Sequence, residues 1–278
     1  MAQNERESNT LAHDVVGQEP AEPGKAPRIG CVKYLNARPL VHGLAGEILF
    51  DHPSKLCEQL ADSRIEVALV SSFEYLRSPV YVLVDGICIA SHGPVYSVFL
   101  AHAGELSDIE EIEVDPASAT SMNLLRCLLA ERGLTPKLVT GTPLVQRAVT
   151  TRVAKFFIGD QAIRFRERST GALRFWDLGE EWEKMTQLPF VYALWLIRPE
   201  VPSPKSIADH LRACRDNNLR ELDSVIAAEK EFSPQFCSRY FRECLSYHFG
   251  AAEKEGFAMF RKFCERHGIL SPRPMSVP

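Results

Sequence analysis

The chain has 278 residues, of which 45% are hydrophobic and 24% are charged, and its formal net charge at pH 7 is −4. This length suffices for one large domain or two of ordinary size, and the composition is typical of a soluble globular protein. No basic cluster with interleaved aromatic residues occurs, which argues against nucleic-acid binding, and no apolar run reaches 18 residues, which argues against a membrane span.

Residues 1–27 combine acidic residues with Ser, Gln, Gly and Pro, a composition that predicts a disordered acidic tail. They contain no apolar run long enough for a secretory signal, so we expect a cytoplasmic protein. The eight cysteines form no CxxC pair, and we expect reduced thiols in the core. No Walker, GxGxxG, GxSxG or HExxH motif occurs, and the sequence predicts no cofactor and no metal.

Strand-like and helix-like segments alternate with short connections from residue 28 onward. We expect strands at 28–34, 48–52 and 66–70 with helices at 39–44 and 54–63 between them, and then strands at 81–90 and 95–102. The first five segments form a βαβαβ unit. Pro39 suits the first turn of the helix that it begins.

A second α/β unit follows, and the chain then becomes helical. We expect strands at 112–115, 137–140, 154–158 and 174–177, and helices at 121–132, 143–150 and 181–185. Residues 189–197 form the longest near-continuous apolar run, which is typical of a strand buried on both faces. Helices are expected at 206–216, 219–229, 235–245 and 251–267.

This pattern indicates two α/β lobes that the chain crosses twice. We expect lobe 1 to comprise residues 28–102 and 193–278, including the helical C-terminal segment, and lobe 2 to comprise 103–192. A cleft between two such lobes is the natural place for a small ligand. The pattern specifies no oligomeric state.

Polar residues gather where the expected strands end, at the edge where open α/β sheets bind ligands. They are Asn36, Ser71 with Ser72, Gly93 with Ser97, residues 118–121, and Gly159 with Asp160. Ordinary roles compete with functional ones. Ser71 and Ser72 can cap the helix after them, and capping is favoured over catalysis for Asp160. For His92, in the turn before Gly93, an ordinary turn role is favoured over ligand contact.

The Ser118-Ala119-Thr120-Ser121 run precedes a predicted helix. It therefore brings hydroxyl groups and free backbone N–H groups to a helix N-terminus, which attracts carboxylates and phosphates. Capping and anion binding explain this run equally well.

Six motifs in register support a resemblance to a known family. They are Tyr34-Leu35-Asn36-x-x-Pro39-Leu40, Val70-Ser71-Ser72-x-Glu74-Tyr75-Leu76, Gly93-Pro94-Val95-x-Ser97-Val98, Ser118-x-Thr120-Ser121, Ile158-Gly159-Asp160-x-Ala162 and Asp177-Leu178-Gly179-x-x-Trp182-x-x-x-Thr186-x-Leu188-Pro189-Phe190-Val191. Between residues 28 and 198 the chain resembles the MqnA family, the chorismate dehydratases of the futalosine route to menaquinone.

The resemblance implies a fold like that of type II periplasmic binding proteins and conversion of chorismate to 3-[(1-carboxyvinyl)oxy]benzoate and water. It also implies that Asn36 and Ser97 are catalytic and that Ser72, Thr120 and Ser121 hold substrate carboxylates. We expect the remaining substrate contacts from the same motifs, at Tyr34, Ser71, Gly93, Ser118, Gly159 and Asp160. The motifs contain no evident His or Glu base, so we hypothesise that the enolpyruvyl carboxylate of the substrate removes the proton while the protein orients the substrate.

The chain departs from the family pattern at Gln187, where glycine is usual, and at Phe156-Phe157, where smaller aliphatic residues are usual. These departures bear on the shape of the cleft and not on the class of reaction. Two other functions stay open. One is a non-catalytic small-anion binding protein of the same fold, and the other is the sister enzyme that makes 1,4-dihydroxy-6-naphthoate. The Tyr-Leu-Asn and Ser-x-Thr-Ser motifs favour the dehydratase.

Overall fold

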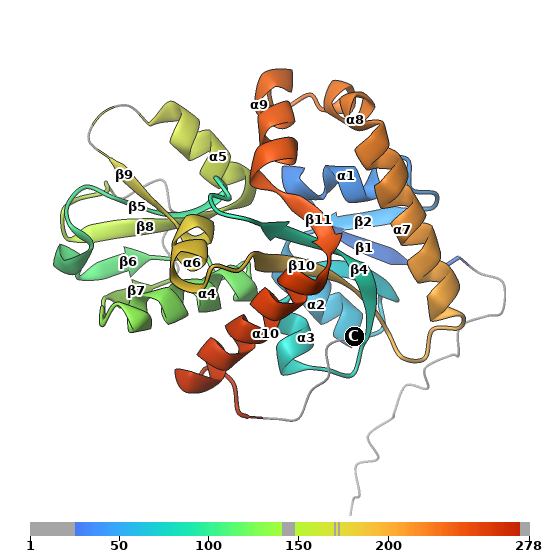
Figure 1. Cartoon of the computed structure of the whole chain (residues 1–278), viewed down its shortest axis with the longest axis horizontal. Helices are drawn as coiled ribbons and strands as arrows, with labels where there is room; N and C mark the ends of the chain where they lie inside the picture. Colours follow the sequence, from blue (N-terminus) through green and yellow to red (C-terminus); the bar gives the residue numbers. More distant parts are fainter. Residues whose placement is uncertain (1–25, 141–147, 170, 172, 273–278) are drawn as a thin grey trace, which may run out of the picture.

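The computed structural model describes residues 26–140, 148–169, 171 and 173–272, and it contains two mixed β-sheets with helices packed against them (Figure 1). The first sheet has the order β11-β4-β10-β3-β1-β2 and the second the order β7-β6-β8-β5-β9. The expected tail lies outside the described residues except for residues 26 and 27.

The bounds of the strands are as follows. The first sheet contains β1 (Ile29–Val32), β2 (Ile48–Asp51), β3 (Val67–Ser71), β4 (Val82–Ser91), β10 (Phe190–Ile197) and β11 (Ser246–Phe249). The second sheet contains β5 (Val98–His102), β6 (Glu111–Glu113), β7 (Lys137–Val139), β8 (Val153–Ile158) and β9 (Arg174–Asp177).

The helices fall into the same two groups and a C-terminal set. They are α1 (Arg38–Val41), α2 (Pro53–Ala61), α3 (Phe73–Arg77), α4 (Ala119–Glu131), α5 (Gly159–Arg168), α6 (Leu178–Thr186), α7 (Pro204–Arg220), α8 (Leu222–Ala228), α9 (Pro234–Arg239) and α10 (Ala251–Arg266). Short 3₁₀ turns cover Leu35–Ala37 and Leu106–Asp108.

Both sheets are built around parallel strands. In the first sheet β1 pairs in parallel with β2 and with β3, which confirms the expected βαβαβ unit. In the second sheet β6 pairs in parallel with β7 and β8. The expected helix at 143–150 lies largely outside the described residues. Parallel strands end at a common edge, so β1 and β3, and likewise β6 and β8, present the loops after them side by side.

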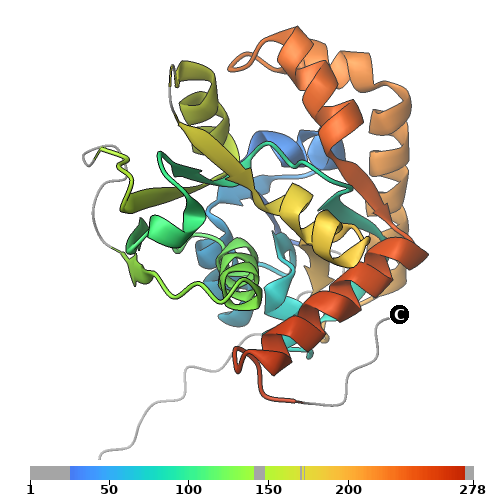
Figure 2. The same ribbon diagram turned by 60° about the vertical axis from the view of Figure 1, so that its left-hand side comes forward.

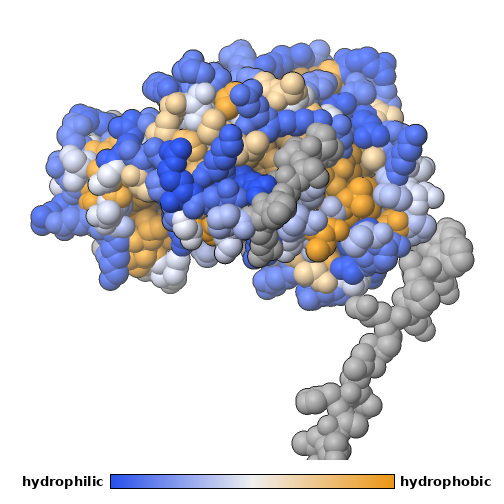
Figure 3. All heavy atoms as spheres, turned by 60° about the horizontal axis from the view of Figure 1, so that its bottom comes forward, coloured by the Kyte–Doolittle hydropathy of each residue, from blue (hydrophilic) through white to orange (hydrophobic). Residues whose placement is uncertain are grey.

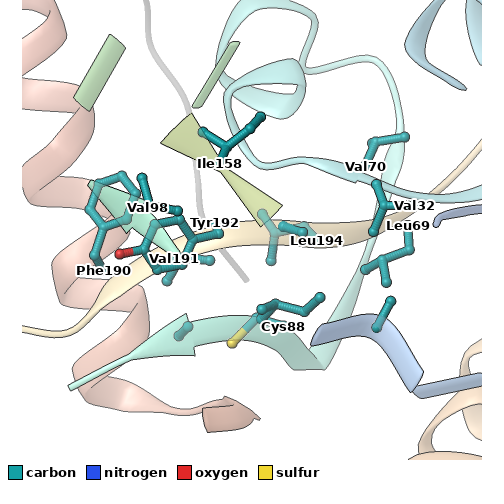
Figure 4. Close-up of a cluster of buried hydrophobic side chains, with 14 of the residues drawn as sticks. Val32, Leu69, Val70, Cys88, Val98, Ile158, Phe190, Val191, Tyr192 and Leu194 are labelled. Atoms are coloured by element: carbon teal, nitrogen blue, oxygen red, sulfur yellow. The ribbon is translucent and has the colours of Figure 1, made fainter. Parts of the chain in front are cut away.

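The apolar run at 189–197 forms β10, and all of its residues are buried, as predicted. It lies in the middle of the first sheet and pairs antiparallel with β3 and β4. Figure 4 shows Tyr192 and Val191 of this strand beside Val98 and Ile158 of the second sheet. The hydrophobic core therefore continues from one sheet to the other beneath the crossing points of the chain.

The chain changes sheet at 92–97 and again at 187–189. The expected lobe boundaries, at 102/103 and 192/193, fall elsewhere: β5 pairs with β8 and β9 in the second sheet, and β10 belongs to the first from Phe190 onward. An apolar run predicts that a strand exists, but it does not specify the strand with which it pairs.

The C-terminal segment differs from the expected run of helices. The expected helix at 235–245 is interrupted: α9 passes into a π-helical segment, Tyr240–Cys244, and then into β11, which pairs antiparallel with β4. Ser233 caps α9 by accepting a hydrogen bond from the backbone N–H of Phe236, as the Ser-Pro start predicts. Helix α10 packs against β10 and also against α4, so it contacts both halves of the molecule (Figure 2).

All eight cysteines are free thiols, and seven of them are buried, as expected. Large exposed hydrophobic residues are few in the described part of the chain, and on the face in Figure 3 the hydrophobic residues lie in separate patches among hydrophilic ones. No described helix combines the length and the apolar character that crossing a membrane requires.

Candidate active site

A cleft lies between the two sheets, at the carboxyl ends of β1, β3, β6 and β8. It encloses about 460 Å³ of space, part of which is open to solvent. Its lining comprises Val32, Tyr34, Asn36, Pro53, Ser71, Ile89, Val95, Ser97, Val98, Ser118, Ser121, Ile158, Gly159, Tyr192 and Ala193. The structure therefore brings together seven of the predicted site residues: Tyr34, Asn36, Ser71, Ser97, Ser118, Ser121 and Gly159.

Asn36 lies in the 3₁₀ turn directly after β1, and Pro39 then opens α1, as expected. The Oδ1 atom of Asn36 is buried and has no hydrogen-bond partner among the described residues. A buried amide oxygen without a partner is costly in a folded protein. Because the side chain lines the cleft, a ligand that donates a hydrogen bond would satisfy it.

Asp160 supports the Asn36 turn from the other sheet. Its Oδ1 accepts the backbone N–H of Leu35 at 2.8 Å, and it makes no side-chain cap on its own helix α5. The expected capping role is therefore real but applies to the opposite lobe. Asp160 does not line the cleft. Burial raises the pKa of its carboxyl to about 6, while the hydrogen bond from Leu35 opposes this shift.

Ser97 follows a strained turn. Tyr96 has φ +68°, a conformation that residues other than glycine rarely adopt, and the N–H of Ser97 donates to the carbonyl oxygen of Val95 at 2.8 Å. This three-residue γ-turn is the rare, strained form. The Ser97 side chain is 1% exposed, and its Oγ accepts a hydrogen bond from the hydroxyl of Tyr240 at 2.7 Å.

Ser71, Ser72 and Thr120 form a hydroxyl cluster that joins β3 to α4. The Oγ1 of Thr120 lies 2.6 Å from the Oγ of Ser71 and 3.2 Å from that of Ser72, and it accepts the N–H of Phe73 at 2.9 Å. Ser72 donates to the carbonyl oxygen of Val191 at 2.7 Å. Thr120, and not Ser72, therefore caps α3. Only Ser71 of these three lines the cleft.

Ser118 is the N-cap of α4, and its Oγ accepts the N–H of Ser121 at 3.4 Å. The two hydroxyl groups are 3.2 Å apart, and both side chains line the cleft. The capping role is thus present, and the same helix terminus also faces the space where a ligand would lie.

Gly159 begins α5 with φ +62°, and a Cβ atom there would lie 2.7 Å from Cδ1 of Tyr34. Only glycine combines this conformation with so close a ring. Gly93 has φ +84° but lies outside the cleft. His92 contacts Glu253 at 2.8 Å, as its expected structural role implies.

Several lining residues were not predicted. Most are apolar side chains, whose burial gives no sign of a site. Tyr192 interrupts the apolar run of β10 with a hydroxyl group, which is a usable signal. Tyr240, behind Ser97, lies in the C-terminal segment and carries no such sign. Gln187, Phe156 and Phe157, where the chain departs from the family pattern, do not line the cleft.

The cleft is polar but uncharged. Among the described residues that line it there is no Asp, Glu, His, Lys or Arg. Burial raises the pKa of the Tyr34 hydroxyl and also that of Tyr192, so both stay protonated at neutral pH. The lining therefore offers hydrogen bonds and helix-terminal N–H groups, but no strong base.

Two α/β lobes that meet at a polar cleft define the type II periplasmic-binding-protein fold. The alkanesulfonate-binding protein SsuA from Xanthomonas axonopodis pv. citri has this fold, and it superposes on 92% of this chain and 96% of its own with a TM-score of 0.63 at 16% identity. The chain belongs to the menaquinone biosynthesis family, whose pattern it matches over residues 27–266.

Two relatives carry the same name. A chorismate dehydratase from Thermus thermophilus is 32% identical over 219 residues, which cover 72% of this chain and 80% of that protein. A chorismate dehydratase from Campylobacter jejuni subsp. jejuni is 30% identical over 234 residues, which cover 84% of this chain and 91% of that protein.

Proposed function

We propose that Asn36 and Ser97 carry out the dehydration of chorismate in the cleft. The chain is a hydro-lyase that acts on chorismate, since it belongs to the menaquinone biosynthesis family and its two relatives are chorismate dehydratases. On this proposal the product is 3-[(1-carboxyvinyl)oxy]benzoate, and aromatisation of the ring drives the loss of water.

The unpartnered oxygen of Asn36 is the observation that carries the assignment. At neutral pH both carboxyl groups of chorismate are ionised, so its C4 hydroxyl is its only hydrogen-bond donor. The cleft residue with a buried, unoccupied acceptor is Asn36. We therefore place the C4 hydroxyl, which is the leaving group, against the Asn36 amide.

Ser97 takes the complementary role. Its Oγ already accepts a hydrogen bond from Tyr240, so its own hydrogen is available to the substrate. A donor at this position stabilises the negative charge that develops on the leaving oxygen. The N-terminus of α4, with Ser118 and Ser121, and the hydroxyl of Ser71 are the groups that hold a carboxylate of the substrate.

The uncharged lining supports substrate-assisted proton removal. The C3 hydrogen and the C4 hydroxyl leave from the same face of the ring, and the enolpyruvyl carboxylate attached through oxygen at C3 is close to that hydrogen. It takes the proton from C3, the electron pair delocalises toward the ring carboxylate, and the C4–O bond then breaks as the ring becomes aromatic. The protein contributes orientation and fixed dipoles.

The test is turnover of chorismate by the purified chain, followed by absorbance and mass of the benzoate product. Loss of the hydrogen-bonding group in Asn36→Ala or Ser97→Ala is expected to lower kcat by roughly 100-fold or more. Asn217→Ala and Ser107→Ala change exposed residues of the same types and serve as matched controls. Near-wild-type turnover by either folded site variant contradicts the assignment. Binding without any product supports a binding protein, and turnover of a futalosine-derived substrate supports the sister enzyme.

A further inference from the structure

We propose that Tyr240 is a positioning residue, which fixes the hydroxyl of Ser97 as a hydrogen-bond donor to the substrate. This inference rests on the role proposed above for Ser97 and extends the site to a residue that does not line the cleft. Tyr240 comes from the C-terminal segment, 143 residues after Ser97.

The Tyr240 side chain is held rigidly. It is 1% exposed, its ring stacks on that of Phe236 with centroids 5.5 Å apart, and Phe241 lies against it at 6.0 Å. Tyr240 also begins the π-helical segment Tyr240–Cys244, and such segments occur frequently at functional sites. A fixed ring gives the hydroxyl group one direction, toward the Oγ of Ser97 at 2.7 Å.

This hydrogen bond decides what Ser97 can do. A serine hydroxyl has one hydrogen and two lone pairs, and its hydrogen can rotate to suit either partner. Because the hydrogen of Tyr240 occupies one lone pair, the hydrogen of Ser97 points away from Tyr240. Ser97 lines the cleft, so that hydrogen is available to a ligand. Two hydrogen bonds in series also polarise each other and strengthen the second donor.

Tyr240 itself keeps its proton. Burial raises the pKa of its hydroxyl, and the nearby carboxylate of Asp160 adds to the shift. A buried tyrosinate would be unfavourable at this place. Tyr240 therefore acts through orientation and is not the acid that protonates the leaving group.

The first test removes the hydroxyl and keeps the ring. Tyr240→Phe is expected to lower kcat about tenfold, with the KM for chorismate changed less than about threefold, because the lost hydrogen bond acts on Ser97 and not on substrate binding. Tyr247→Phe is the matched control. Tyr247 is buried on β11, and its hydroxyl oxygen has no partner among the described residues, so its removal leaves kcat unchanged.

The second test asks whether Tyr240 acts through Ser97. In a Ser97→Ala background, Tyr240→Phe is expected to cause no further loss of kcat, whereas independent roles would give multiplied losses. A further tenfold loss in that background overturns the proposal, as does a Tyr240→Phe enzyme as active as Tyr247→Phe. If Ser97→Ala itself turns over normally, the proposed role of Ser97 fails first, and this outcome is distinct.

Folding is monitored by melting temperature and circular dichroism for each variant. If Tyr240→Phe does not fold, Phe236→Leu provides a second route, since it loosens the stacked ring and leaves the hydroxyl in place. A lower kcat that disappears in the Ser97→Ala background supports the proposal, and an unchanged kcat contradicts it.

Discussion

The carboxylate of Asp177 accepts the backbone N–H of Tyr96 at 2.8 Å and so holds a residue other than glycine at φ +68°. Its other oxygen accepts the N–H of Val95 at 3.0 Å. The Tyr96 ring lies near two guanidinium groups, those of Arg166 at 4.3 Å and Arg239 at 5.0 Å. A left-handed conformation costs about 1–2 kcal/mol per residue, and these contacts offset it. The position of Ser97 therefore depends on Asp177.

Replacing Asp177 by asparagine tests this dependence. The amide retains one acceptor oxygen and directs N–H groups at backbone donors, so we expect a loss of about 2 kcal/mol in the free energy of unfolding. We also expect a lower kcat, since the turn before Ser97 relaxes. Urea denaturation and chorismate turnover measure the two effects. Asp223→Asn, at a 92% exposed side chain, is the control, and equal losses in both variants would contradict the role of Asp177.

Thr120→Val tests the hydroxyl cluster between β3 and α4. The substitution keeps the shape but removes the acceptor for the N–H of Phe73 and the partner of Ser71. We expect a loss of about 1–3 kcal/mol in the free energy of unfolding, since these groups are buried. Thr135→Val, at an exposed position after α4, is expected to change stability by less than about 0.5 kcal/mol. If Thr120→Val keeps full stability and loses only affinity for chorismate, then Thr120 holds substrate and not structure.

The sequence predicts much of this architecture because local patterns reflect it. The residues of β10 are buried on both faces, and an uninterrupted apolar run requires such a strand. The polar residues at strand ends converge because parallel strands end together, and seven of them meet in one cleft. Gln187, where the family usually has glycine, has φ +58° at the end of α6, which explains the preference for glycine there.

The rest depends on contacts between distant segments. The strand β11 was expected to be helical or loop because its pairing with β4 lies more than 150 residues away in the sequence. The bond from Tyr240 to Ser97 and the bond from Leu35 to Asp160 join different sheets and segments. No periodicity encodes such pairs, and Asp160 and Thr120 therefore had the right location but a different partner from the one expected.

The raised pKa of Asp160 makes the stability of the fold depend on pH. Burial raises the pKa of this carboxyl from 3.8 to about 6, so the folded chain binds the proton more tightly than the unfolded chain. The resulting stabilisation is complete below pH 3.8 and is lost as the pH rises through about 6. Relative to Asp160→Asn, we expect the wild-type free energy of unfolding to fall by up to about 3 kcal/mol over this range.

Denaturation of both proteins at a series of pH values measures this difference. Asp62→Asn, at an exposed side chain, is the control, and its stability is expected to run parallel to that of the wild type at every pH. If the wild type and Asp160→Asn also run parallel, the carboxyl titrates at its ordinary pKa, and burial does not control it.

Gly159 and Gly133 separate the cost of an unusual backbone from the cost of a steric clash. Both have left-handed backbones, with φ +62° and +67°, but a Cβ atom at 159 would lie 2.7 Å from the Tyr34 ring, whereas one at 133 has nothing within 4 Å. Gly133→Ala therefore measures strain alone, about 1 kcal/mol. Gly159→Ala adds the displacement of a cleft-lining ring, and we expect a further loss of about 1–3 kcal/mol in the free energy of unfolding.

The same pair distinguishes stability from function. Because Tyr34 lines the cleft, Gly159→Ala should also weaken chorismate binding, while Gly133→Ala leaves it unchanged. Denaturation and equilibrium binding measured on both variants decide the point. Equal losses of stability would show that the ring moves aside without cost. Normal affinity in Gly159→Ala would show that Tyr34 shapes the wall of the cleft without contacting the substrate.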